Sequence, residues 1–185
     1  MQFDKQGPNP AISVGEDRIG ILMTRRDKSV HILIVDRKNY AKCQPQRWCV
    51  AGTAKSHPRS TLYAQTKVLM PNGKRKWVSA HKFLFGGEGY LLDHENGDGL
   101  CCVETNMRRA DTYENARNRG KNRNNVAGYK GVSAHGSGWR AMIGHLYKHI
   151  SLGTYRTREE AARAYDKACI ALHGVFGKPN FPLAV

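Results

Sequence analysis

The stretch 129–174, YKGVSAHGSGWRAMIGHLYKHISLGTYRTREEAARAYDKACIALHG, decides the expected fold. Its first part contains three short runs typical of β-strands, which are 129–135, 138–145 and 148–155. From Thr157 the pattern T-x-x-E is a capping box, which opens a helix. Small and apolar residues then recur at helical spacing, and Gly174 ends the helix. The stretch therefore predicts a three-stranded antiparallel sheet packed on one helix.

Side-chain alternation divides this sheet into two faces, because successive residues of a strand point to opposite sides. The expected inner face, toward the helix, carries Trp139, Ala141, Ile143, Ile150 and Leu152. The expected outer face carries Arg140, Met142, His149 and Ser151. A three-stranded sheet of this kind can offer its outer face to the major groove of DNA.

The same stretch resembles the DNA-binding domain of the plant ethylene-response factors (the AP-two/ERF type), which also occurs attached to HNH nucleases. The matching motifs are YKGV at 129–132, WRAMI at 139–143, LGTY at 152–155, TREEAARAYDKA at 157–168, LHG at 172–174 and NFP at 180–182. In that family, sheet residues contact DNA. The resemblance implies contacts by Lys130, Ser133, His135, Arg140, Met142, His149 and Ser151. Ser, His or smaller groups replace several Arg and Trp positions of the plant domains, so the resemblance does not imply the plant recognition sequence.

A second polar pattern precedes this domain. Asp93 and His94 are adjacent, Asn106 follows twelve residues after His94, and Asn115 follows nine residues later. A neutral imidazole such as that of His94 can take a proton from water. A hard cation prefers oxygen ligands, which Asp93 and Asn115 can supply, and Asn106 can orient the site. The pattern therefore predicts hydrolysis of a phosphodiester with one divalent metal ion.

This pattern resembles the HNH nucleases, in the variant whose last motif residue is Asn. The residues 90–92 fit the first strand of their ββα-metal fold, and Asp111 or Thr112 can cap the helix that carries Asn115. The sequence GLCCVETNMR departs from the family pattern at Cys101 and Cys102. The resemblance implies catalytic His94 and Asn106, a Mg²⁺ or Mn²⁺ ion, and a mobile gene of phage or intron type acting in the host cytosol.

Charge points to a polyanionic partner. The chain has 30 Lys and Arg against 15 Asp and Glu, a net charge of +15, which favours nucleic acid over a membrane surface. The segment 116–130 contains no acidic residue and no apolar periodicity, which predicts a flexible basic linker at 119–128. The candidate phosphate contacts are Arg108, Arg109, Arg117, Arg119, Lys121 and Arg123.

The N-terminal part is expected to be rich in β-strands after a loose lead-in at 1–18. The expected strands lie at 19–24, 30–36, 48–51, 62–70 and 75–78, with a short helix at 79–85. His81 lies in that helix, and a packed or solvated role is preferred to a second catalytic histidine. The five Cys form no C-x-x-C pair, which favours reduced thiols in a cytosol. A zinc site formed by Cys43, Cys49 and the pair at 101–102 remains a minor alternative.

Together these patterns predict an α+β protein with three parts: a β-rich nuclease domain at 1–118, a basic linker at 119–128 and a DNA-binding domain at 129–185. The expected function is a metal-dependent HNH endonuclease of the homing type that nicks double-stranded DNA. The first alternative is a sequence-specific DNA-binding regulator whose nuclease motif is inactive. The second is a basic protein that associates with RNA or ribosomes. The sequence indicates no membrane segment and no protein partner.

Overall fold

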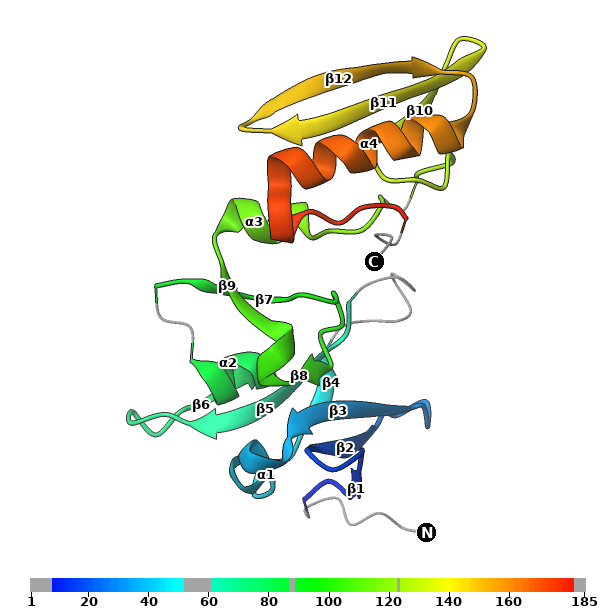
Figure 1. Ribbon diagram of the computed structural model, residues 1–185. Helices are drawn as coiled ribbons and strands as arrows, with labels where there is room; N and C mark the ends of the chain where they lie inside the picture. Colours follow the sequence, from blue (N-terminus) through cyan, green and yellow to red (C-terminus); the bar gives the residue numbers. More distant parts are fainter. Residues whose placement is uncertain (1–7, 52–60, 87–88, 123, 182–185) are drawn as a thin grey trace. The chain divides into compact units, whose positions relative to one another are not determined.

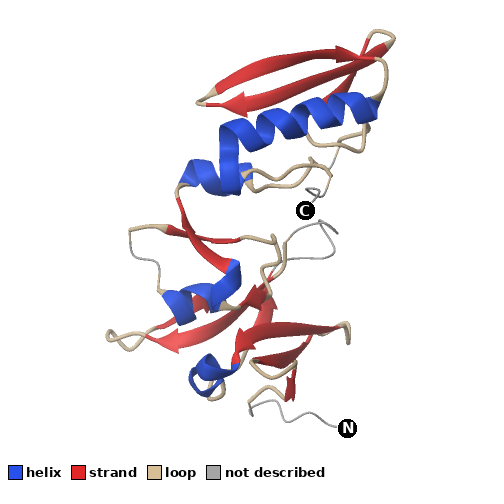
Figure 2. Cartoon of the chain, viewed as in Figure 1, coloured by secondary structure: helices blue, strands red, loops and turns tan. Residues whose placement is uncertain are grey.

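The structure, a computed structural model, describes residues 8–51, 61–86, 89–122 and 124–181. The chain divides into two compact units, Met1–Ala110 and Asp111–Val185, which are described separately (Figures 1 and 2). The division lies at 110/111, whereas the sequence predicted it at 118/119. Arg123, a candidate phosphate contact, and Pro182 of the NFP motif lie outside the described residues.

The first unit contains a four-stranded sheet with the order β1-β2-β3-β8. Its strands are β1 (Ala11–Ser13), β2 (Arg18–Thr24), β3 (Val30–Asp36) and β8 (Cys101–Cys102). β2 and β3 form the predicted antiparallel hairpin. β8 pairs parallel to β3, and β1 lies within the segment that was expected to be a loose lead-in.

A second, antiparallel sheet has the order β4-β5-β6, with strands β4 (Cys49–Ala51), β5 (Tyr63–Leu69) and β6 (Arg75–Ser79). The short helices are α1 (Arg37–Cys43) and α2 (Ala80–Phe85). A two-stranded antiparallel pair joins β7 (Leu91–His94) to β9 (Met107–Ala110), and the 3₁₀ turn η1 (Glu104–Asn106) precedes β9. The core includes Ile21, Met23, Leu33, Val35 and Trp48. Helix α1 was not predicted.

The second unit has the predicted architecture of a three-stranded antiparallel sheet with a helix along one face (Figure 1). Its elements are α3 (Thr112–Arg117), β10 (Val132–His135), β11 (Gly138–His145), β12 (Lys148–Tyr155), α4 (Arg158–His173) and η2 (Gly174–Phe176). Both hydrogen bonds of the capping box join Thr157 and Glu160. The α+β class is therefore confirmed.

Helix α4 packs on the sheet through small side chains. Ala161 and Ala162 are fully buried and belong to one cluster with Val132 and Ala141. These short side chains bury apolar surface while the helix stays close to the sheet. The strand alternation is interrupted, however, because the register of β11 on β12 shifts between Ala141 and Met142.

Ile150 departs from the predicted inner face. It lies opposite Ile143 in the register, but 38% of its surface is exposed. Ile150 lies on the edge strand of the sheet, where it has a neighbouring strand on one side only. Leu152 and Trp139, by contrast, pack against the core as predicted.

The expected basic linker is folded into the second unit. The Asn125 side chain donates to the carbonyls of Tyr129 (2.6 Å) and Val132 (3.3 Å) and accepts from the Gly128 amide at 2.8 Å. Ala127 is buried. The asparagines of this segment were interpreted as a mark of flexibility, but Asn125 satisfies backbone groups and holds a series of turns together.

Candidate nucleic-acid interface

The outer face of the second unit's sheet is the face turned away from α4, and it is largely polar. Arg140, on the central strand β11, lies between Ser133 of β10 and Thr154 of β12. One step along β11, Met142 lies opposite Ser151. These outer-face residues alternate with the buried residues of β11 and place hydrogen-bonding groups in a row across all three strands.

His135 and His149 extend this face toward its two ends. His135 lies opposite Gly138, and His149 lies opposite Gly144; both histidines are exposed. Because a glycine lies opposite each ring, neither histidine faces a bulky neighbour across the strand pair. Thr154 was missed by the sequence prediction, although its alignment with Arg140 in a hairpin register could have indicated it.

Arg140 is the cation at the centre of the outer face. Its side chain is partly buried, and its Nε has no hydrogen-bond partner in the described part of the chain. Within the same residues it makes no ion pair with a carboxylate. A guanidinium that no internal carboxylate neutralises keeps its charge and its hydrogen-bonding plane for a ligand.

Lys130, the other cation that the resemblance implied as a DNA contact, has a different orientation. Its Nζ donates to the carbonyl oxygen of Arg117 at 2.6 Å and lies 5.9 Å from the Tyr165 ring centroid. Burial lowers the pKa of Lys130, although nearby Cys169 and Asp166 oppose that change. The side chain therefore links the end of α3 to the domain.

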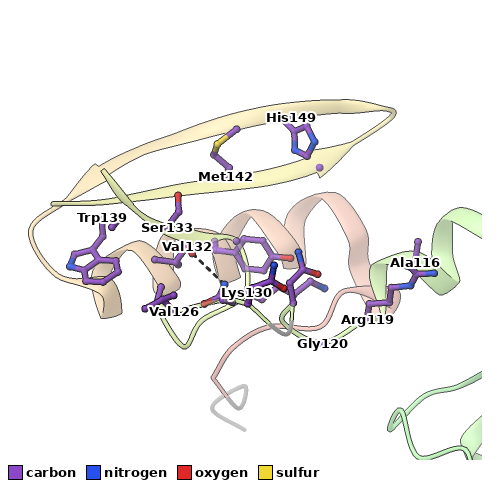
Figure 3. Close-up of a pocket in the computed structure, with 18 residues that line it drawn as sticks. Ala116, Arg119, Gly120, Val126, Lys130, Val132, Ser133, Trp139, Met142 and His149 are labelled. Carbon is purple, nitrogen blue, oxygen red and sulfur yellow. Dashed lines mark hydrogen bonds between the residues drawn. The ribbon is translucent and has the colours of Figure 1, made fainter. Parts of the chain in front are cut away.

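A groove of about 840 Å³ runs beside the outer face, between the sheet and the segment that follows α3. Figure 3 shows Trp139 at one end and Ala116 and Arg119 at the other, with Met142 and His149 on the sheet side. Arg119 and Lys121 are exposed; Lys121 also donates to the Gly128 carbonyl at 2.7 Å. Cations therefore lie close to the outer face without being part of it.

In the Asp93–His94 pair of the first unit, Asp93 is held by a contact that belongs to the fold. The Oδ2 atom of Asp93 accepts a hydrogen bond from Nε of Arg108 at 2.9 Å and forms an ion pair with Nη2 of the same residue at 2.8 Å. Only 5% of Asp93 is exposed. Arg108 lies directly opposite Asp93 in the β7–β9 pair, so the residue expected to contact phosphate neutralises the expected metal ligand. The guanidinium of its neighbour Arg109 lies 4.4 Å from the Tyr90 ring centroid.

The ring of His94 is enclosed by other side chains. Its centroid lies 5.1 Å from that of His81 and 5.8 Å from that of Tyr63, and its Nε2 lies 3.6 Å from Sγ of Cys102. Burial lowers the pKa of His94, and burial followed by the charge of His94 lowers the pKa of His81 to about 4. Both imidazoles therefore favour the neutral form.

The remaining two residues of the predicted nuclease motif, Asn106 and Asn115, belong to different units. Asn106 holds the turn after β7, because its Nδ2 donates to the Cys101 carbonyl at 2.7 Å and its Oδ1 accepts from the Asn96 amide at 3.0 Å. Asn115 lies on α3, in the second unit. Among the residues that the structure describes, no three His, Cys, Asp or Glu side chains are grouped so that they could hold a metal ion.

Comparison with known proteins shows similarity to plant transcription factors. No family model matches the chain. The ethylene-responsive transcription factor WRI1 of Arabidopsis thaliana is 43% identical over 63 residues, which is 32% of this chain and 15% of that protein. ERN3 of Medicago truncatula, also an ethylene-responsive transcription factor, is 47% identical over 60 residues, 31% of this chain and 25% of that protein. The chain thus spans a quarter or less of these two relatives.

These findings support an AP2/ERF-like domain and overturn the enzyme prediction. The relatives are transcription factors, and none of those named is a nuclease. The prediction of a metal-dependent HNH endonuclease is therefore wrong, and so is that of a Mg²⁺ or Mn²⁺ cofactor. The physical reason lies in the first unit, where Arg108 already neutralises Asp93 and the described residues form no metal-binding cluster. The alternative, a DNA-binding regulator, agrees better with these relatives.

None of the helices in the described ranges has the length and apolar character needed to cross a membrane. The expected cytosolic location stays a prediction.

Proposed function

We propose that the second unit binds double-stranded DNA through the outer face of β10–β11–β12, and that the chain is a sequence-specific DNA-binding regulator. The single observation that carries this proposal is the row Ser133–Arg140–Thr154, which crosses the sheet opposite α4. Its support is the similarity of about a third of the chain to plant transcription factors.

The chemistry of this face suits the edges of base pairs. An arginine can donate two hydrogen bonds to O6 and N7 of a guanine, and this pair discriminates against the wrong base by about 1–3 kcal/mol. The hydroxyls of Ser133, Ser151 and Thr154 can donate or accept. Met142 offers an apolar contact for a thymine methyl group. Since Ser and His occupy several positions that are Arg or Trp in the plant domains, we expect a different recognition sequence.

The positive charge supplies the part of the affinity that does not depend on sequence. The chain carries a net charge of +15, and Arg119 and Lys121 are exposed near the outer face. Cations of this kind contact phosphates, release counterions and make the affinity fall as salt rises. The groove beside the sheet gives a DNA strand room to pass between the two sets of contacts.

The experiment begins with selection of binding sites from a random double-stranded DNA library, followed by fluorescence anisotropy on the best site. Arg140→Ala should weaken binding to that site by about 1–3 kcal/mol, or roughly fivefold to 150-fold, and relax the preference at one base pair. The matched control is Lys167→Ala, which removes one charge from an exposed position of α4. It should alter the affinity only slightly.

Two results would overturn the proposal. One is a selection that enriches no sequence, which would reduce the chain to a non-specific polyanion binder. The other is an Arg140→Ala protein that binds the selected site as tightly and as selectively as the unaltered chain, since the central cation of the outer face would then have no part in recognition.

A further inference from the structure

A second cavity of the C-terminal unit lies between α3, the β11–β12 hairpin and the end of α4, and has a volume of about 330 Å³. We call it the anion pocket. Its polar lining includes Tyr113, Arg117, Lys130, His145, Lys148 and His173. No carboxylate side chain is among its lining residues in the described part of the chain. The potential inside it is therefore positive.

Two imidazole nitrogens of residues that line this pocket are buried and have no hydrogen-bond partner among the described residues. His173 is 7% exposed, and its Nε2 lies 3.0 Å from the Gly144 carbonyl oxygen. Because a carbonyl only accepts, Nε2 carries the proton and donates. Nδ1 of His173 is buried and, within the described residues, has no hydrogen-bond partner; the same holds for Nδ1 of His145.

The rings of His145 and His173 are in contact with each other. Their rings stack at 5.8 Å between centroids with 23° between the planes, and both residues line the anion pocket. A buried polar atom without a partner costs about 1–3 kcal/mol. Two such atoms on residues that line one cavity point to a polar ligand in that cavity.

The surrounding charge decides the class of ligand. Burial lowers the pKa of His173, and Arg117, Lys130 and His145 lower it further, against the opposing effect of the hydrogen bond to Gly144. These effects favour the neutral form of His173. An anion would offset these cations and let Nδ1 take a proton and donate, whereas a metal cation would meet repulsion from Arg117, Lys130 and Lys148.

We propose that the anion pocket binds a phosphate group, through Nδ1 of His145 and of His173 and the charges of Arg117 and Lys148. The phosphate comes from one of two sources. A DNA backbone phosphate can reach it because Lys148 and His149, at the start of β12, lie both on the pocket and at the end of the DNA-facing sheet; this source rests on the proposed function. Free phosphate, inorganic or on a nucleotide, is the other.

The first experiment tests the pocket without DNA. Inorganic phosphate is added to the full chain while the imidazole nitrogens are followed by NMR. The Nδ1 signals of His145 and His173 should shift and saturate, whereas chloride at equal ionic strength should not cause this shift. His173→Gln keeps an amide donor for the Gly144 carbonyl but lacks Nδ1, so it should lose the saturable response. The matched control His31→Gln, in the first unit, should retain it.

A linear response, an equal response to chloride, or a response to Zn²⁺ and not to phosphate would overturn the proposal, whether or not the chain binds DNA. The source then follows from DNA binding by His145→Ala and His173→Gln. If the salt dependence of binding to the selected site weakens by about one phosphate contact, the pocket holds a backbone phosphate. If DNA binding is unchanged while the phosphate response is lost, the ligand is a free phosphate.

Discussion

At the scale of single residues, the two packed histidines of the first unit couple folding to pH. Burial, together with the charge of His94, lowers the pKa of His81 to about 4, while a histidine in an unfolded chain titrates near about 6.5. At a pH between these two pKa values, His81 binds a proton in the unfolded chain but not in the folded chain. The free energy of unfolding therefore falls as the pH falls through this window.

We expect His81→Phe to flatten this pH dependence. A phenylalanine keeps an aromatic ring against His94 but cannot take a proton. His81 is partly exposed, so its contribution to the loss should be on the order of 1–2 kcal/mol between pH 6.5 and 4. Urea unfolding at several pH values measures it. An unchanged slope in His81→Phe would show that another group, such as His94, causes the whole effect.

The pair Asp93–Arg108 provides the second prediction at this scale. Arg108→Ala leaves the Asp93 carboxylate, which is 5% exposed, without the hydrogen bond and ion pair that the guanidinium supplies. Removing one partner of a buried pair costs up to about 3–5 kcal/mol, and Arg108 is itself largely buried, so we expect a loss in the lower part of that range. Chemical denaturation of the first unit measures the loss.

The matched control for Arg108→Ala is Lys38→Ala. Lys38 also pairs with a carboxylate, that of Glu104 at 2.5 Å, but both side chains are exposed to solvent. Solvent screens such a pair, so the free energy of unfolding should change far less. Equal losses in the two variants would contradict the interpretation of Asp93 as a structural carboxylate.

At the scale of secondary-structure elements, Gly131 sets the approach of α4 to the sheet. Its φ is +75°, and a Cβ there would lie 2.0 Å from Cδ2 of Tyr165 on α4. Gly136 has a similar φ of +58°, but nothing lies within 4 Å of its Cβ position. Gly136→Ala should cost only the backbone strain, about 1–2 kcal/mol. Gly131→Ala should cost that strain and about 1–3 kcal/mol more for the clash.

Thermal unfolding of the two glycine variants separates these contributions. Equal destabilisation would mean that Tyr165 can move away at no cost, and that α4 is not held at its present distance by Gly131. In that case Gly131→Ala should also leave DNA binding unchanged, because the sheet would keep its shape.

How far each element was predictable depends on how local its signals are. The bounds of β11 and β12 match the prediction, and α4 begins after its capping box at Thr157, because turn residues and caps act over a few positions. Strand β8, by contrast, has two residues and pairs with β3, far away in sequence. Helix α1 was missed because its seven residues have no apolar periodicity.

The difference between local signals and distant contacts also explains which residues of the candidate sites could be predicted. Arg140 and Met142 were predictable as outer-face residues from strand alternation alone. The orientation of Lys130 depends on its contact with Arg117. The neutralisation of Asp93 depends on Arg108, which lies across a strand pair. Neither contact follows from the spacing of residues in the sequence. A motif defined by residue types at fixed offsets contains no information about such partners, which is why the nuclease prediction failed.

At the scale of the whole molecule, the last prediction concerns the start of the second unit. The structure places α3 in that unit, whereas the sequence predicted a domain beginning at 129 after a linker. Three features connect α3 to the rest of the unit: the Lys130 ammonium on the Arg117 carbonyl, the Tyr113 and Tyr147 rings at 4.5 Å, and the buried Asn118. If these contacts matter, the smallest stable fragment must include α3.

We therefore expect a fragment of residues 111–185 to fold and to bind the selected DNA site with the specificity of the full chain. A fragment of residues 119–185 lacks α3 and should be less stable by about 1–3 kcal/mol, where each kcal/mol lowers the melting temperature of a domain this size by about 4–8 °C. Circular dichroism and anisotropy measure both properties. If 119–185 melts at the same temperature as 111–185, α3 does not stabilise the sheet, and Lys130 is available for DNA. If instead 111–185 folds but loses specificity, the first unit must contact DNA as well.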